Sequence, residues 1–171
     1  MHYKKLLFVV IFSVLFSSCN ILFFKNDLPQ IMGLEKIEVE NVKKLNEWTG
    51  EQGEGITLEV YRISQNNIRT FEDNSVKNLP DKKDGKEWQK YDWHTLPVDS
   101  SYKGIFTMGL NYSGDNNNVR DALDEIKKLI GFNNNYNIYY SFYYRPDKEN
   151  PQNVQLFILD VENRKLYAVN R

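Results

Sequence analysis

The clearest pattern of hydrophobic and polar positions lies between residues 119 and 130. Apolar side chains recur there every three or four positions and so fall on one stripe of a helix; they are Val119, Ala122, Leu123, Ile126, Leu129 and Ile130. Asn118 can cap the start of this helix. Asp124 and Lys128 have the i, i+4 spacing of a favourable ion pair. The pattern predicts one main amphipathic helix, over about 119–130, packed on a core.

Three segments after this helix show the alternation or apolar content of strands. They are 138–144, 154–160 and 166–169, and short polar turns separate them. Strands joined by short turns pair as an antiparallel meander. Ile138, Tyr140, Phe142 and Tyr144 would share one face, with Val154, Leu156 and Ile158 as the matching set on the next strand. One face of the meander should pack under the helix.

The chain before residue 119 is less regular. Alternation predicts strands at 37–40, 56–63 and 88–96, and Ser64 can cap a short helix over 65–73. Residues 74–86 have the composition of an exposed loop, and the apolar stretch 102–112 fits either type of element. Together these elements predict the α+β class: a single small domain with a mostly antiparallel sheet.

The first 18 residues have the three parts of an export signal. Lys4 and Lys5 form a basic start, residues 6–16 are apolar except for Ser13, and Ser17-Ser18 provides small residues for cleavage. We therefore interpret residues 1–18 as a signal peptide and not as part of the fold.

The end of this segment makes the interpretation more specific. Leu15-Phe16-Ser17-Ser18-Cys19 resembles the lipobox of bacterial lipoproteins, with Phe16 where that family usually has Leu. The resemblance implies cleavage before Cys19 and lipid on its sulfur, palmitate among the acyl groups. It places the protein in the cell envelope, held on the non-cytoplasmic side of a membrane, the outer membrane in a Gram-negative cell. Cys19 is the only cysteine of the chain.

Two alternatives to the lipoprotein remain open. Residues 6–24 are close to the roughly 20 apolar residues of a spanning helix, although the polar cluster at 17–20 makes insertion costly. The first alternative is therefore an uncleaved membrane anchor, and the second is an ordinary secretory signal in which Cys19 is incidental. For the lipoprotein we expect a signal peptide over 1–18, a lipidated cysteine and short tether over 19–33, and a globular domain over 34–171. The apolar residues 21–24 would lie in the membrane interface or dock on the domain.

Composition and charge exclude several classes of protein. Removal of residues 1–18 takes two of the 22 basic side chains and none of the 23 acidic ones, which leaves a net charge of about −3 and does not favour a nucleic-acid partner. A domain without cysteine has no disulfide, cysteine nucleophile or cysteine zinc site. The 11 Tyr, 10 Phe and 3 Trp of the chain indicate a globular core and not a disordered segment.

No catalytic, cofactor or metal site is predicted. His94 is the only histidine after residue 18 and has no G-x-S-x-G serine to serve, so we interpret it as a surface or half-buried residue beside Trp93. The carboxylate pairs Glu51/Glu54 and Glu72/Asp73 are interpreted as solvated charges. The glycine-rich stretch 50–55 lacks the ending of a phosphate loop, and residues 115–118 are better explained as a helix cap than as a calcium loop.

The aromatic side chains of the meander are the candidate binding surface. If Tyr140 and the alternate residues Phe142 and Tyr144 face the core, the other face carries Tyr139 and Tyr143, with Phe157 on the next strand. Exposed aromatic rings on a sheet would suit a glycan or an envelope protein. The alternative is that a second layer, such as residues 88–93, covers them.

These observations lead to a functional expectation. We expect a lipid-anchored envelope lipoprotein whose domain is a non-catalytic binding module for an unknown ligand. An envelope-polymer hydrolase that uses carboxylates is one alternative, and a membrane-tethered immunity or inhibitor protein is another.

Overall fold

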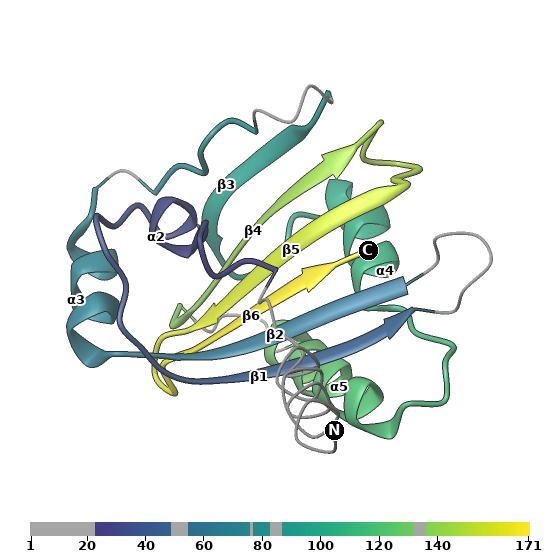
Figure 1. The fold of residues 1–171 in the computed structure, drawn as a ribbon. Helices are drawn as coiled ribbons and strands as arrows, with labels where there is room; N and C mark the ends of the chain where they lie inside the picture. The colour runs from purple at the N-terminus through teal and green to yellow at the C-terminus, as the bar shows by residue number, and fades with distance from the viewer. Residues whose placement is uncertain (1–22, 49–54, 76, 83–86, 132–135) are drawn as a thin grey trace, which may run out of the picture.

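The computed structural model describes residues 23–48, 55–75, 77–82, 87–131 and 136–171, and they form a six-stranded antiparallel sheet with helices on both sides. The strand order is β1-β2-β6-β5-β4-β3 (Figure 1). This arrangement confirms the predicted α+β class and the mostly antiparallel sheet.

The predicted meander forms one half of the sheet. Its strands are β4 (Ile138–Arg145), β5 (Asn153–Asp160) and β6 (Lys165–Asn170). The register confirms the matching set, because Tyr140 lies opposite Ile158 and Phe142 opposite Leu156. Alternation along β4 and β5 therefore selected the correct side chains for one face.

The other strands flank this meander. β1 (Val39–Trp48) and β2 (Gly55–Ile63) form a hairpin, and β2 pairs with the last strand, β6, so that Leu58 lies opposite Val169. β3 (Gln89–Thr95) pairs with β4 at the opposite edge. The second strand of the chain thus pairs with the last one, and β1 and β3 form the two edges of the sheet.

Helices α4 (Lys103–Leu110) and α5 (Asn117–Gly131) cover one face of the sheet, after a short 3₁₀ turn at Ser100–Tyr102 (Figure 1). The apolar stripe of α5 is buried as predicted, at Val119, Ala122, Leu123 and Ile126. These side chains share a core with the inner face of the meander. The main amphipathic helix is therefore confirmed, one or two residues longer at each end.

Two local details of α5 differ from the sequence prediction. The side-chain oxygen of Asn116, not Asn118, accepts the first free backbone N–H groups, from Asn118 at 3.0 Å. Asp124 pairs with Lys127 at 3.2 Å, not with Lys128. Neighbouring asparagines are interchangeable as caps, and i, i+3 and i, i+4 partners are equally near on a helix, so sequence spacing does not select between them.

The second face of the sheet is covered by the first described residues together with α3. Helix α2 (Leu28–Ile31) packs there with Phe24 and Met32, and α3 (Gln65–Asp73) adds Ile68 and Phe71. Ser64 accepts a hydrogen bond from the Asn67 N–H at 3.3 Å, which confirms the predicted cap of α3.

The structure corrects the predicted tether over 19–33, because residues 24–32 pack in the folded domain. Phe24 and Leu28 are buried, with 1% and 0% of their surface exposed, and belong to the second core. The predicted start of the domain at residue 34 is therefore too late. The apolar segment before it packs on the sheet because this burial removes its side chains from water. Of residues 21–24, Phe24 docks on the domain, whereas the side chain of Phe23 is 49% exposed.

Candidate functional site

The aromatic face that the sequence offered as a binding surface is mostly covered. Phe157 has 0% and Tyr143 3% of its surface exposed, and Tyr139 is half-buried. The Phe24 ring meets Phe157 edge-on at 5.3 Å, and Phe71 meets Tyr139 in the same way at 5.2 Å. An exposed aromatic surface over these residues is therefore a wrong prediction.

A second layer covers this face, as the alternative proposed, but the predicted segment supplies only Trp88 and Trp93 to the buried cluster. Residues 89–95 form β3 within the sheet itself. The other covering residues come from 24–32, α3 and Leu79. Leu79, in the predicted exposed loop 74–86, is buried, and its N–H donates to the Asp92 carboxylate at 2.8 Å.

The remaining candidates have simple outcomes. Cys19, Glu51 and Glu54 lie outside the described residues. Glu72 and Asp73 are exposed at the end of α3. His94 is exposed, as expected, and its Nδ1 lies 2.8 Å from the Asp92 carbonyl oxygen. Within the described ranges, no three His, Cys, Asp or Glu side chains are grouped as metal ligands would be.

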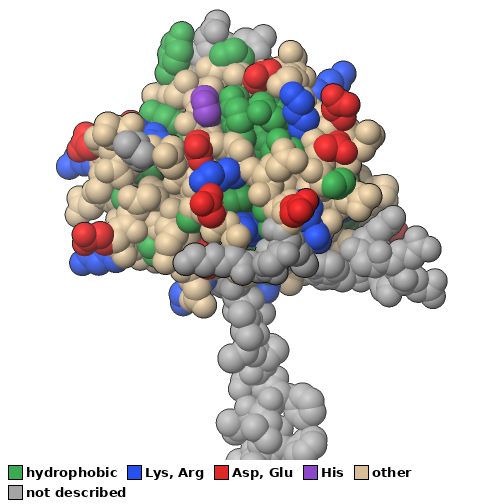
Figure 2. Space-filling model, turned by 90° about the horizontal axis from the view of Figure 1, so that it is seen from above, with side chains coloured by type: hydrophobic (Ala, Val, Ile, Leu, Met, Phe, Trp, Pro, Cys, Tyr) green, Lys and Arg blue, Asp and Glu red, His purple; other side chains and the backbone are tan. Residues whose placement is uncertain are grey.

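A second aromatic group lies at the β3 edge. Tyr91 stacks on His94 at 4.3 Å and on Phe142 at 5.0 Å, and Tyr102 leans against Tyr91 at 4.5 Å. Figure 2 shows hydrophobic side chains gathered beside the histidine on this side of the molecule. Burial and the hydrogen bond with Tyr140 raise the pKa of Tyr91 to about 12. These rings continue the α4–α5 core outward, so their first role is to close the edge of that core.

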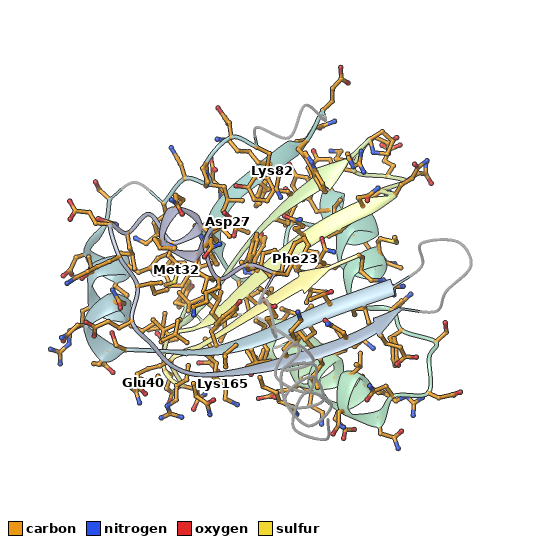
Figure 3. All side chains as sticks on the ribbon, in the orientation of Figure 1. Phe23, Asp27, Met32, Glu40, Lys82 and Lys165 are labelled. Carbon is orange, nitrogen blue, oxygen red and sulfur yellow. The ribbon has the colours of Figure 1, made fainter. Side chains whose placement is uncertain are left out.

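A cavity of about 420 Å³ opens where the second layer meets the sheet. It lies over the paired residues Tyr143 and Gln155 of β4 and β5. The N-terminal segment and the segment before β3 form its walls, with Phe24, Asp27, Gln30, Ile31, Pro80, Asp81 and Lys82. Figure 3 shows Asp27 and Lys82 on the side of the sheet that carries α2. Its volume is in the range of small-molecule sites.

Lys82 is the cation of this cavity. Its Nζ donates to the Gln155 side-chain oxygen and lies 4.8 Å from the ring centroids of both Trp88 and Tyr143. A cation between two aromatic faces is stabilised by the ring quadrupoles. The ammonium group is therefore held in one place at the cavity wall, where an anionic or carbonyl group of a ligand could accept from it.

The floor of the cavity is polar and internally satisfied. The Tyr143 hydroxyl donates to the Pro80 carbonyl at 2.6 Å, and the Gln155 amide donates to the Asn170 side-chain oxygen at 3.0 Å. Burial and the nearby Asp27 charge raise the pKa of Tyr143. The hydroxyl therefore remains a protonated donor, which ties the segment before β3 to the sheet.

Of the two carboxylates at the cavity, Asp81 is suited to ion pairing and not to proton donation. The hydrogen bond from Lys90 and its charge lower the pKa of Asp81, and the two groups are 2.8 Å apart. Asp81 is exposed and stays ionised at neutral pH, whereas a general acid needs a raised pKa. Asp27 is also exposed at the rim. One cation and two anions around an aromatic wall can recognise a small polar ligand or a protein side chain.

Comparison of the chain with family models, curated proteins and solved structures finds no match. The fold and the cavity define an α+β domain with a small, polar-floored cavity. The sequence pointed to Tyr143 but missed Lys82 and Gln155, which are 73 residues apart. The apolar run 156–159 was the one available sign, because a strand that is apolar on both faces is covered on both.

Proposed function

We propose that this chain is the precursor of a bacterial lipoprotein, anchored by lipid on Cys19, with a non-catalytic binding domain in the cell envelope. The observation that carries the proposal is the export signal that ends at the only cysteine of the chain, in a lipobox-like context. The cavity over Tyr143 and Gln155 supports the binding role, because its fixed polar groups and the ionised Asp81 favour recognition over acid catalysis.

The packing of Phe24 bears on the uncleaved-anchor alternative. Its ring is buried against Phe157, so it cannot also lie in the apolar part of a bilayer. Phe24 is therefore not available to the apolar stretch 6–24 that an uncleaved spanning helix would use. Among the described residues, none of the helices has the length and apolar character needed to cross a membrane.

The anchor is tested by the mass of the N-terminal peptide of the membrane-bound protein, beside a Cys19→Ala variant. We expect a peptide that begins at acylated Cys19, and loss of membrane association in the variant. A peptide that retains residues 1–18, with membrane association unchanged in Cys19→Ala, would contradict the lipoprotein and establish an uncleaved anchor.

The binding role is tested by photo-crosslinking in whole bacterial cells. A crosslinking amino acid at Asp27, on the cavity rim, is compared with one at Asp121, which is exposed on α5 on the opposite face. We expect a reproducible adduct from position 27 that Lys82→Ala weakens, and none from position 121. Identical adducts from both positions, or turnover of an envelope polymer by the purified protein, would contradict a non-catalytic role for the cavity.

A further inference from the structure

A buried carboxylate fixes the place where the folded domain meets its tether. Glu59 of β2 is fully buried and accepts the backbone N–H groups of Phe23 at 2.6 Å and Phe24 at 3.0 Å, together with the Tyr61 hydroxyl. Three donors to one carboxylate compensate its removal from water. The chain is therefore held on the sheet from Phe23 onward.

The anchor on Cys19 then leaves almost no free chain. Only Asn20, Ile21 and Leu22 separate Cys19 from Phe23. Four residue steps at full extension span at most about 14 Å. The Phe23 backbone must therefore lie within about 14 Å of a cysteine whose acyl chains are in the bilayer, and two of the three connecting side chains are apolar.

The side chain at this attachment point suits a membrane interface. Phe23 is 49% exposed and is one of two large hydrophobic side chains exposed among the described residues; the other is Tyr136. The Phe23 ring stands edge-on to the buried Phe24 ring, with centroids 4.7 Å apart. Its position is thus set by the core, while its outer part faces away from the protein. Aromatic residues are enriched at the membrane–water interface.

We propose that the sheet face carrying Phe23 and α2 lies against the phospholipid bilayer, with Phe23 in the interfacial layer; this inference rests on the proposed lipid anchor. Phe23, Asp27 and Lys82 lie on this same side of the sheet (Figure 3), so the cavity opens toward the membrane. Helices α4 and α5, on the other face (Figure 1), point into the aqueous compartment. The occupant of the Phe23 surface is the lipid surface itself.

The chain offers a direct way to measure this orientation. The sulfur of lipidated Cys19 is blocked, so an introduced cysteine is the one free thiol of the mature protein. Lys25→Cys, beside Phe23, and Asp121→Cys, on α5, replace exposed side chains. Each variant is purified in lipidated form, labelled with a nitroxide and reconstituted in vesicles of phosphatidylethanolamine and phosphatidylglycerol. Accessibility to aqueous nickel chelate and to membrane-soluble oxygen is then measured.

We expect several-fold lower nickel accessibility, and higher oxygen accessibility, for the label at position 25 than at position 121. Adding Phe23→Ser should raise the nickel accessibility at position 25, whereas Tyr136→Ser, the matched aromatic control, should not. Equal aqueous accessibility at positions 25 and 121 in a protein whose N-terminal mass shows lipid would overturn the orientation and leave the anchor intact. A mass without lipid would overturn the anchor and the orientation together.

Discussion

Two adjacent phenylalanines allow a sharp test of whether the chain before residue 34 belongs to the domain. Phe24 is 1% exposed and packs on Phe157, whereas Phe23 is half-exposed. Truncation of a buried phenylalanine to alanine costs about 3–5 kcal/mol. The segment can relax around the space left by the ring, so we expect Phe24→Ala to lower the free energy of unfolding by about 3 kcal/mol. Phe23→Ala loses mainly one ring contact and should cost about 1 kcal/mol or less.

Urea unfolding of the chain from residue 20, followed by tryptophan fluorescence, measures both variants. With an m-value of about 2 kcal/mol/M, Phe24→Ala should lower the midpoint by about 1.5 M and Phe23→Ala by about 0.5 M or less. Equal shifts for the two variants, or no shift for either, would refute the docking of residues 23–32 and restore the tether. The comparison is controlled internally, since both changes remove the same ring from neighbouring positions.

Three further predictions concern the buried carboxylate, acid stability and the close approach of α4. Glu59→Ala should destabilise the domain by about 3 kcal/mol and make the Phe24 amide exchange freely with solvent; unchanged exchange by NMR would contradict the Glu59 hydrogen bonds. Burial raises the pKa of Glu125, but hydrogen bonds from Lys165 and a tyrosine outweigh it and lower the pKa. The ionised Glu125 therefore stabilises the folded domain above its unfolded-state pKa, about 4.3, and this stabilisation is lost as the pH falls through the lowered folded-state pKa. Glu125→Gln should therefore make the free energy of unfolding depend less on pH in that window. A Cβ on Gly109 would lie 3.4 Å from a β5 side chain, so Gly109→Val should overpack the core and cost about 1–3 kcal/mol in thermal unfolding; a Tm equal to that of the unchanged protein would argue against this contact.

The sequence by itself determined the elements whose signals are local. The stripe of α5 requires only a 3.6-residue period, and the meander only alternation and short turns. The α+β class, the helix and strand bounds to within two residues, and the set of side chains that share a face of β4 and β5 therefore followed from neighbouring residues. The Ser64 cap was predictable for the same reason, because its donor, Asn67, lies three residues away. The lipobox-like segment is likewise a local pattern, and its lipidation stays a prediction.

The tertiary structure alone decided which face of the sheet is covered and where the cavity lies. Alternation states that Tyr139, Tyr143 and Phe157 share a face, but it is silent on whether a distant segment packs there. Phe24 packs on Phe157, which lies 133 positions further along the chain, and Lys82 meets Gln155, which lies 73 positions further along. Such contacts depend on apolar area and hydrogen-bond partners that exist only after the sheet has formed, and no periodicity in the chain encodes them.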